Sequence, residues 1–434
     1  MRNADGTTAV LRGRLAESTR GPTVSSRPLA AEVLVVGAGP AGSAAAAWAA
    51  RHGLDVLLAD AAHFPRDKAC GDGLTPRAMA ELDRLDLGAW ARSRVTNRGL
   101  RAHGFGQVLE LPWPGGHLPD HGSAVPRTEL DDRVRQVAED SGARMLLGAR
   151  AIDVVRDGER VRAVVLETAE GRVEVACRWL VVADGVRSPL GRLLGRTWHR
   201  DTAYGVAARG YADTDRDDDW ISSHLELRGE QGELLSGYGW IFPLGGGRVN
   251  VGVGTLATAR RPANVSLKPL MRYYADGQRD RFALGPEVRE PSSALLPMGG
   301  AVSGVAGPNW LLVGDAAACV NPLNGEGIDY GLETGRFAAD LVAADDDPEQ
   351  AWPALLRAHY GTSFSIARRL AGLITVPGLL ARLGPVGMRS RLLMTVALRV
   401  MGNLVTEEDR DVVARAWRLA GRTSVTFEDR PPFS

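Results

Sequence analysis

A strand, a glycine-rich turn and a helix near the N-terminus constrain the fold of this chain more than any other feature. The apolar run 33–36 leads into three glycines spaced G-x-G-x-x-G, Gly37, Gly39 and Gly42, and an alanine-rich segment follows them. The first glycine permits a tight turn, the second lets a pyrophosphate approach the backbone, and the third lets helix and strand pack closely. The amides at the start of the helix then face the phosphates.

A second apolar strand strengthens this prediction. Residues 56–60 form a short hydrophobic run that ends in Asp60, at the distance from the glycines expected for an acid that binds a ribose hydroxyl. The glycine spacing alone is a weak signal, but here strand, helix, second strand and terminal acid are all in register. The chain is therefore predicted to bind a dinucleotide.

Composition argues against several other classes of protein. The 434 residues are enough to bury a large core, and 52 basic residues balance 52 acidic ones, so no net charge favours nucleic acid as a partner. Cys70, Cys177 and Cys319 lie far apart and form no C-x-x-C pair, and the histidines show no metal-ligand spacing. We expect a reducing compartment, no disulfide framework and no metal site.

Both ends of the chain bear on its location. Residues 1–30 are polar without a continuous apolar stretch, so we expect a flexible extension and no signal peptide. The sequence contains no window of eighteen apolar residues free of charge, so no transmembrane helix is expected.

Residues 361–406 contain no Asp, Glu or Lys but six arginines among apolar residues. Such helices either lie in a membrane interface or cap the core. The expected location is peripheral, on the cytoplasmic side of the membrane, with contact through Arg368 to Arg399.

Turn signals divide the chain into regions of different pattern. Helices are expected from about Pro76 and from about Thr128 to Ser141. Strands over 144–147, 149–155, 161–167 and 173–177 would form an antiparallel insert, followed by a separate buried strand at 179–183. The predicted α/β (α+β) fold has a dinucleotide-binding domain at 31–200 and 296–345, an inserted antiparallel-sheet domain at 201–295, and a C-terminal helical region at 346–434.

Two further patterns supply candidate site residues. Tyr238, Trp240 and Phe242 alternate along one strand, so their rings share one face, as core or as a binding surface. The buried strand 310–313 ends in Gly314-Asp315, where the acid is placed to hydrogen-bond a polyol, and residues 325–328 would present backbone amides at a helix start.

Together these motifs resemble a known group of flavoproteins. The glycine loop with Asp60, Asp184-Gly185 and Gly314-Asp315 are similar to the FAD-binding fold of the para-hydroxybenzoate-hydroxylase-like group. Within it, Pro65-x-x-Lys68-x-Cys70-Gly71 and the segment 238–254, Tyr-x-Trp-x-Phe-Pro followed by Gly-x-Gly, resemble the geranylgeranyl reductase family. The resemblance covers about 32–341 and implies a Rossmann-type FAD-binding domain with an inserted sheet domain that binds the substrate.

The resemblance implies a role for each matching residue. Arg127 would contact the FAD diphosphate, Asp60 the adenosine ribose and Asp315 the ribityl chain. Amides at 325–328 would face the flavin N1/O2 edge, with Cys70 near the isoalloxazine. The cofactor-binding candidates are Gly37, Gly39, Pro40, Ala41, Gly42, Asp60, Lys68, Cys70, Arg127, Asp184, Gly314, Asp315, Gly325, Gly327 and Ile328. The substrate-binding candidates, which would line an apolar channel, are Tyr238, Trp240 and Phe242.

The resemblance also implies a reaction. Family members with Cys-Gly-Asp-Gly-Leu-Thr-Pro-Arg and Tyr-Gly-Trp-Ile-Phe-Pro saturate the second (β) isoprene unit of the menaquinone tail. An isolated alkene has no carbonyl to polarise it, so hydride from reduced FAD must be coupled to proton delivery at the other carbon. Cys70 is the catalytic candidate for the proton, with an ordered water as the alternative. The electron donor stays open among NAD(P)H, a redox protein and quinol, because no second G-x-G-x-x-G unit occurs.

Two positions depart from the related patterns. Ala318 stands where hydroxylases of this fold usually carry a His after Gly-Asp-Ala-Ala, which disfavours a monooxygenase. Glu326 interrupts a run that is glycine-richer in related reductases, and it would either tune the flavin or serve as an acid.

Three other functions stay open at this point. The first is reduction of another prenyl chain, such as geranylgeranyl diphosphate or an archaeal-type ether lipid. The second is an FAD-dependent aromatic monooxygenase or halogenase. The third is a membrane-docked flavin protein without turnover.

Overall fold

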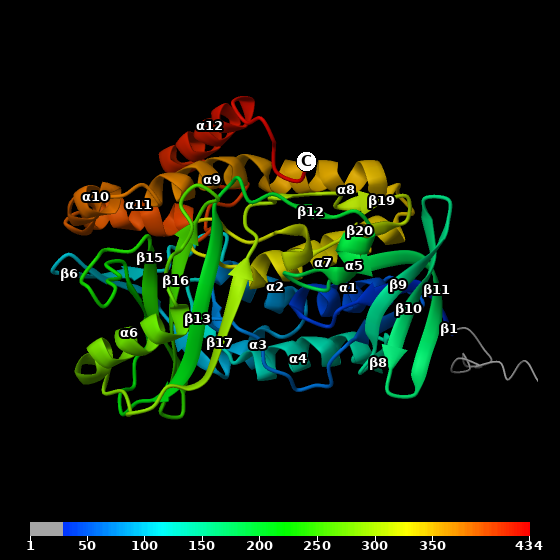
Figure 1. The fold of residues 1–434 in the computed structure, drawn as a ribbon, viewed down its shortest axis with the longest axis horizontal. Coiled ribbons are helices and arrows are strands. Elements are labelled where there is room, and N and C mark those ends of the chain that lie inside the picture. The colour runs from blue at the N-terminus through cyan, green and yellow to red at the C-terminus, as the bar shows by residue number, and fades with distance from the viewer. Residues whose placement is uncertain (1–28) are drawn as a thin grey trace, which may run out of the picture.

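Two lobes lie side by side, each built on its own sheet, and helices from the C-terminal part of the chain extend over both (Figure 1). The computed structural model describes residues 29–434, so the extension expected over 1–30 lies almost wholly outside the described residues. The first lobe carries the glycine loop, and the second lobe carries the aromatic strand.

The first lobe is built on an eight-stranded sheet with a parallel centre in the order β20–β11–β1–β2–β8. Its strands are β1 (Leu29–Val36), β2 (Val56–Asp60), β8 (Arg144–Leu147), β9 (Arg150–Asp157), β10 (Arg160–Thr168), β11 (Gly171–Val182), β19 (Ala306–Gly307) and β20 (Trp310–Leu312). Its helices are α1 (Pro40–Arg51), α2 (Pro76–Arg84), α3 (Gly88–Arg92), α4 (Arg127–Asp140), α5 (Pro189–Leu193) and α7 (Ile328–Ala343). Helix α1 packs on α4 and α7, which buries the apolar runs of β1 and β2 in the core.

Two strands of this sheet differ from the sequence prediction. The expected strands at 173–177 and 179–183 are a single strand, β11. Its first half pairs antiparallel with β10, and its second half, from Val175, pairs parallel with β1. The partner changes along the strand while the backbone continues, so no turn separates the two halves. Strand β8, expected in the antiparallel insert, pairs parallel with β2.

The second lobe is a seven-stranded sheet in the order β17–β13–β16–β15–β14–β5–β6. Its strands are β5 (Gly99–Gly104), β6 (Gln107–Pro112), β13 (Tyr204–Asp213), β14 (Ile221–His224), β15 (Gly237–Gly245), β16 (Arg248–Ala257) and β17 (Arg289–Leu296). Helix α6 (Leu267–Phe282) buries Leu270, Met271 and Tyr274 against the sheet. The region 201–295 was expected to supply the whole sheet, but β5 and β6 come from earlier in the chain because β5 pairs with β14.

Smaller elements connect the lobes. A three-stranded sheet joins β3 (Gly73–Leu74), β7 (Gly122–Ala124) and β4 (Val95–Asn97), and β12 (Thr197–Trp198) pairs with β18 (Val302–Ser303). The short 3₁₀ turn η1 (Gly314–Ala317) follows β20. Strand β3 lies in the segment 61–75, which carries Cys70 and is called the Cys70 loop below. Its pairing with β7 holds this loop in place.

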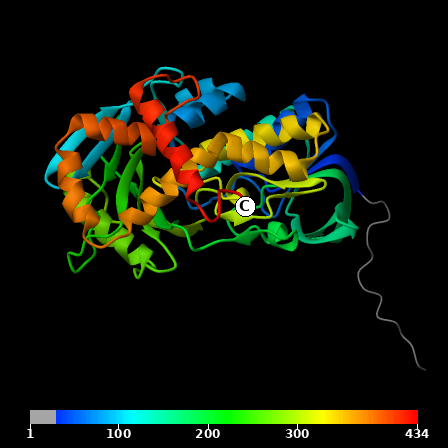
Figure 2. The ribbon, with the colours of Figure 1, turned by 90° about the horizontal axis from the view of Figure 1, so that it is seen from above.

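The C-terminal region is helical and runs along the length of the molecule (Figure 2). It contains α8 (Pro348–Leu356), the π-helical segment η2 (Arg357–Gly361), α9 (Thr362–Ile374), α10 (Leu379–Met388), α11 (Arg391–Met401) and α12 (Val412–Thr426). Met388 and Leu398 pack on β5 and β6, which fixes the α10–α11 hairpin to the outer edge of the second sheet.

No single helix within residues 29–434 has the length and apolar composition needed to cross a membrane. One helix pair, 348–374 with 379–388, meets these criteria together but is bent by 111° at its break.

Candidate functional site

The glycine loop is shaped by close backbone contacts at the ends of β1 and β11. Gly37 has φ +106°, and a Cβ there would overlap the carbonyl of Ala183. A Cβ on Gly42 would overlap the carbonyl oxygen of Gly37. Helix α1 begins after Gly39 without a side-chain cap, so its first amides are left for a ligand. The loop therefore needs glycine for conformation at one position and for close packing at the other.

Asp60 lies against the same loop. Its Oδ2 accepts a hydrogen bond from the amide of Ala38 at 2.6 Å, and its Oδ1 accepts one from the amide of Ala62 at 2.8 Å. These bonds fix the carboxylate at the end of β2, beside the start of α1. The position agrees with that of an acid that holds a ribose in a dinucleotide fold.

A second arginine, Arg66, lies beside the glycine loop. Its NH2 lies 3.5 Å from the position that a Cβ on Gly39 would take, so it faces the open side of the glycine loop. The guanidinium of Arg127 is buried and makes two bonds to Asp131, at 2.6 and 2.8 Å. Arg66 also contacts Asp131, at 2.9 Å. Which arginine faces Gly39 depends on tertiary packing.

The return segment after β20 brings Asp315 next to Lys68. Lys68 Nζ lies 3.0 Å from Asp315 Oδ2, and Oδ1 faces Gly327, where a Cβ would come within 3.2 Å of it. Helix α7 begins at Ile328 without a side-chain cap, so a second set of helix amides is available beside Asp315. Gly314 and Gly325 have positive φ values, +55° and +77°, which let the chain turn into η1 and toward α7.

These features fit FAD. The FAD cradle is the surface from the start of α1 to the start of α7. It contains the two uncapped helix N-termini and the glycine loop, and Arg66 and Lys68 lie between them. Asp184 has a different place: its oxygens accept bonds from the Ser188 hydroxyl and the Leu190 amide at the start of α5. Its own amide forms part of the wall beside Gly37. Pro40 is the first residue of α1, and Ala41 packs against Gly314 and Gly331.

The Cys70 loop lies between the two lobes and contains a buried acid that the sequence analysis did not identify. Cys70 Sγ accepts a hydrogen bond from the amide of Asp72 at 3.3 Å. Asp72 Oδ2 accepts bonds from Tyr211 and Asn250, both at 2.9 Å. Burial raises the pKa of Asp72 to about 6 and raises that of the Cys70 thiol, so the thiol stays protonated at neutral pH.

The aromatic stripe packs directly on this loop. Trp240 is buried, donates to Asn250 Oδ1 at 2.8 Å and lies flat over Gly252, where a Cβ would overlap its ring. Its ring centroid is 5.8 Å from that of Tyr238 and 6.2 Å from that of Phe242. A Cβ on Gly71 would meet Trp240 and Phe242 at 3.4 Å. The structure therefore brings the stripe and the Cys70 loop together, with Tyr238 and Phe242 half-buried.

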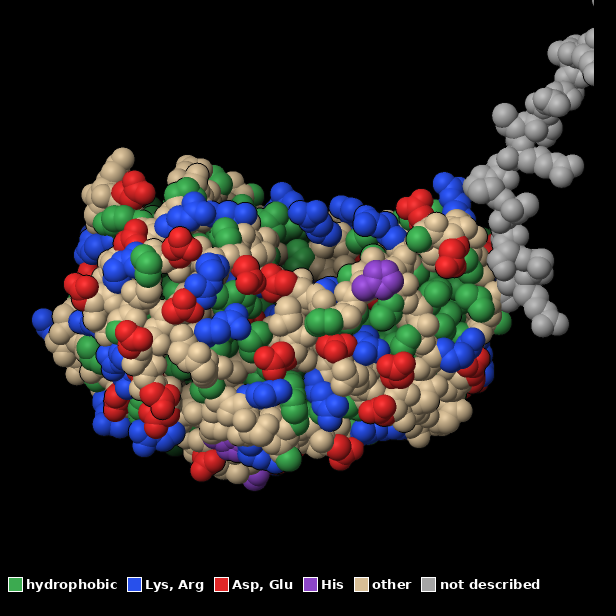
Figure 3. Space-filling view, turned by 90° about the horizontal axis from the view of Figure 1, so that it is seen from below, with side chains coloured by type: hydrophobic (Ala, Val, Ile, Leu, Met, Phe, Trp, Pro, Cys, Tyr) green, Lys and Arg blue, Asp and Glu red, His purple; other side chains and the backbone are tan. Residues whose placement is uncertain are grey.

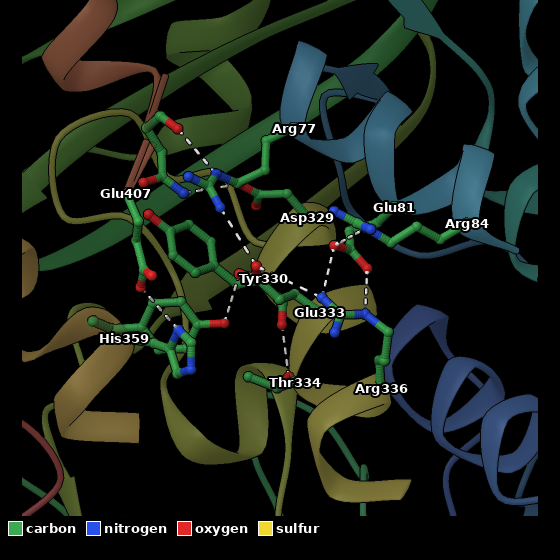
Figure 4. A network of polar contacts seen from close by, with 12 residues as sticks. Arg77, Glu81, Arg84, Asp329, Tyr330, Glu333, Thr334, Arg336, His359 and Glu407 are labelled. Atoms are coloured by element: carbon green, nitrogen blue, oxygen red, sulfur yellow. Dashed lines mark hydrogen bonds and ion pairs between the residues drawn. The ribbon is translucent and has the colours of Figure 1, made fainter. Parts of the chain in front are cut away.

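A buried polar network lies behind the site, between α2, α7 and the end of α11 (Figure 4). Arg77 lies 3.4 Å from Glu333 and donates to the carbonyl of Asn403 at 3.0 Å. Tyr360 donates to Glu333 Oε2 at 2.7 Å. Burial raises the pKa of Asp329 in this network to about 7, although Arg77 opposes the shift. Glu326 precedes α7, and the hydroxyl of Thr75 donates to its Oε1.

The molecular surface adds one observation about charge. Acidic and basic side chains alternate over the face in Figure 3, and hydrophobic side chains are scattered among them. A recess opens at the upper edge of this view, with Lys and Arg side chains along its rim. Within residues 29–434, no group of His, Cys, Asp and Glu side chains has an arrangement that could hold a metal ion.

Comparisons with known proteins point to one family. Residues 30–228 match the FAD binding domain. The chain is 62% identical over 408 residues to menaquinone reductase of Mycolicibacterium smegmatis, covering 93% of this chain and 99% of that protein. It is 31% identical over 323 residues to digeranylgeranylglycerophospholipid reductase 1 of Methanopyrus kandleri, covering 74% and 83%. A geranylgeranyl bacteriochlorophyll reductase-like structure from Thermoplasma acidophilum has a TM-score of 0.70 at 21% identity, covering 93% and 97%.

Proposed function

The chain belongs to the geranylgeranyl reductase family of FAD-dependent oxidoreductases, and we propose that it saturates the second (β) isoprene unit of the menaquinone tail. The observation that carries this proposal is the contact between the aromatic stripe and the Cys70 loop. In this arrangement an apolar surface from the second lobe meets the edge of the FAD cradle. A linear prenyl chain needs such a surface, because it offers no polar group for recognition.

The chain's own residues would hold the cofactor along the cradle. Arg66 and the α1 amides would bind the diphosphate, Asp60 the adenosine ribose, and Asp315 with Lys68 the ribityl side, while α7 amides would face the flavin ring. When bound and reduced, FAD supplies two electrons and one hydrogen to the alkene. In this division of labour the first lobe binds FAD, and the second sheet binds the tail.

The second hydrogen must come from an acid beside the double bond. Tyr238 and Phe242 would hold the alkene and exclude water, and their faces would stabilise positive charge that develops on carbon. Cys70 is one candidate acid, because its thiol keeps its proton and lies at the base of the stripe. Its amide contact with Asp72 holds the sulfur in place.

The first experiment is mass spectrometry of menaquinone after anaerobic incubation with dithionite-reduced, FAD-loaded protein. We expect a gain of two hydrogens, and fragmentation should place them in the isoprene unit second from the ring. Reduction of the naphthoquinone ring alone would contradict the proposal. Turnover of geranylgeranyl diphosphate with no turnover of menaquinone would assign the site to a different prenyl substrate.

We also propose that the α10–α11 hairpin contacts the membrane that contains the quinone. Its outward face exposes four large apolar side chains, Leu383, Val386, Leu392 and Leu393. Arg382, Arg389 and Arg391 are exposed beside them, and no acidic residue occurs between 361 and 406. An apolar face bordered by arginines is complementary to a lipid surface with anionic headgroups.

The other arginines of this region have partners within the protein. Arg368 is buried and donates to the carbonyl of Gly299 at 2.6 Å, and Arg369 donates to Ser424. Arg399 pairs with Asp409 and Asp411. The contact region expected from Arg368 to Arg399 is therefore narrowed to 382–393.

Flotation with anionic liposomes tests this contact. The double variant Leu383→Glu/Leu392→Glu should lose liposome binding, because each change places a carboxylate in the lipid boundary. Leu419→Glu, an equally exposed leucine position on α12, is the matched control and should bind like the unchanged chain. Equal flotation of all three proteins would contradict the proposal.

A further inference from the structure

Two carboxyl groups, Glu326 and Asp329, lie at the start of α7. Asp329 is fully buried and Glu326 is half-buried. Within residues 29–434, neither forms an ion pair within 4.0 Å. The guanidinium of Arg77 is directed at Glu333 instead, at 3.4 Å (Figure 4). The negative charge of these two carboxylates is therefore not compensated by an ion pair unless the groups bind protons.

Glu326 lies where the cluster meets the proposed substrate channel. The Thr75 hydroxyl donates to its Oε1, and Asn324 Nδ2 lies 3.5 Å from its Oε2. The carbonyl of Asn324 in turn accepts the hydroxyl of Tyr238, the first residue of the aromatic stripe. Asn324 thus connects Glu326 to the aromatic stripe. Glu326 also precedes the α7 amides that would face the flavin.

The surroundings favour the neutral form of these carboxyl groups. Loss of water and the charge of Asp329 raise the pKa of Glu326 well above its ordinary value. The titratable and charged groups that face the pair are Arg77 from α2, Tyr238 from β15, Cys319 from the segment after η1, and Tyr330 and Glu333 from α7. Arg77 is the cation among them, and it is already engaged by Glu333.

We propose that Glu326 donates the proton that the prenyl double bond takes up, and that Asp329 returns a proton to it after each turnover. Thr75 and Asn324 are positioning residues for the carboxyl group. The inference rests on the proposed function. In the step the π bond breaks and two C–H bonds form: one hydrogen and the electron pair come from reduced FAD, and the other hydrogen is the proton of Glu326. Glu326 is left as a carboxylate.

Asp329 is the neighbouring carboxyl group whose charge raises the pKa of Glu326. Its Oδ2 is held by Asn403 at 3.3 Å, whereas its Oδ1 is buried without a hydrogen-bond partner among the described residues. A buried carboxyl oxygen without a partner is costly, unless it carries or exchanges a proton. Cys70 is the competing donor, but a buried thiol with a raised pKa is a weaker acid than a carboxyl group.

The test compares tail reduction by reduced, FAD-loaded variants in a single anaerobic turnover. Glu326→Gln keeps the shape but has no proton to give, and it should lower the rate by ~100-fold or more with FAD still bound. Glu326→Asp should restore part of the rate. Asp340→Asn, which neutralises an exposed carboxyl on the same helix, is the matched control and should react like the unchanged enzyme.

A second readout needs no turnover. The infrared spectrum of the FAD-free chain at neutral pH should contain a protonated-carboxyl C=O band that weakens in Glu326→Gln and persists in Cys70→Ala. A Glu326→Gln enzyme with a rate within ~threefold of the unchanged enzyme, or with an unchanged band, overturns the role of Glu326. An unchanged enzyme that reduces no prenyl tail overturns the proposed function, and this role falls with it.

Discussion

The two lobes bury polar clusters that respond to burial in opposite ways. The carboxyl cluster of the first lobe, Glu326, Asp329 and Glu333, contains groups whose pKa values are raised. The histidine pair of the second lobe, His103 on β5 and His224 on β14, stacks with ring centroids 4.4 Å apart. Burial lowers the pKa of His103 to about 4 and that of His224 to about 3, and the charge of Arg281 adds to both shifts.

The comparison shows what burial can and cannot do for catalysis. In both clusters, loss of water disfavours the charged form. An acid that loses its charge gains a proton that it can donate at neutral pH, whereas a histidine that loses its charge has already released its proton. The carboxyl cluster is therefore suited to proton delivery, and the histidine pair is suited to packing between β5, β14 and α6.

The clusters should also affect stability with opposite dependence on pH. Below pH 6.5 the unfolded chain protonates histidines that the folded chain keeps neutral, so the histidine pair loses stability as pH falls. Above about pH 4 the unfolded chain ionises carboxyls that the folded chain keeps protonated, so the carboxyl cluster loses stability as pH rises. Variants in each cluster separate the two effects.

The largest effect is expected from removal of the cation in the carboxyl cluster. Arg77→Met leaves the buried Glu333 with only the more distant guanidinium of Arg336, at 4.0 Å, and should lower the free energy of unfolding by about 3 kcal/mol. Denaturant unfolding at pH 7 measures the change. Arg84→Met on the same helix removes a largely exposed arginine and should cost less than about 1 kcal/mol. Equal losses in the two variants would show that the cluster does not depend on Arg77.

A large pH-dependent effect is expected from the histidine pair. His224→Gln removes an imidazole whose pKa is about 6.5 in the unfolded chain and about 3 in the folded chain. As pH falls below 6.5, the free energy of unfolding of the variant should rise relative to that of the unchanged chain by ~1.4 kcal/mol per pH unit. The measurement is denaturant unfolding across pH 4 to 7. His117→Gln, at an exposed position, should leave the slope unchanged, and an unchanged slope in His224→Gln would break the contrast between the lobes.

Asp329→Asn should change the pH dependence of stability with the opposite sign and by a somewhat smaller amount. The amount is smaller because Arg77 offsets part of the rise that burial causes in the pKa of Asp329. The folded pKa of Asp329 is about 7, so the contribution of this carboxyl group to stability falls as pH rises from about 4 to 7, and the variant lacks this contribution. The variant should gain up to ~1.4 kcal/mol per pH unit relative to the unchanged chain. Asp340→Asn is the exposed control. A gain toward low pH would contradict the assigned shift.

Several parts of the molecule could be predicted because their constraints are local. The glycine loop depends on consecutive residues, since Gly37 needs a positive φ and Gly42 needs close approach within one turn. The aromatic stripe follows from strand periodicity alone, which places Tyr238, Trp240 and Phe242 on one face. The FAD cofactor and the family followed from the same motifs, and both are confirmed by the relatives.

Other parts depended on contacts between distant segments. Arg66, which the sequence did not single out, faces Gly39, while Arg127, the expected diphosphate contact, pairs with Asp131. Strand β5 joins the second sheet by pairing with β14, and β6 joins it by pairing with β5; no local pattern specifies the β5–β14 pairing. The roles of individual site residues stay predictions until variants are measured.

Sequence by itself therefore determined the dinucleotide unit, the strand faces and the arginine-rich helices, because backbone geometry and side-chain periodicity act over a few residues. Tertiary structure alone decided which charges are paired. Arg368 and Arg382 occur in the same acid-free stretch, yet the first is buried against Gly299 and the second is exposed. Glu326 was an interruption among glycines until folding placed the distant Thr75 beside it. Burial and partner choice set a group's charge, and both arise only when segments far apart in the chain pack together.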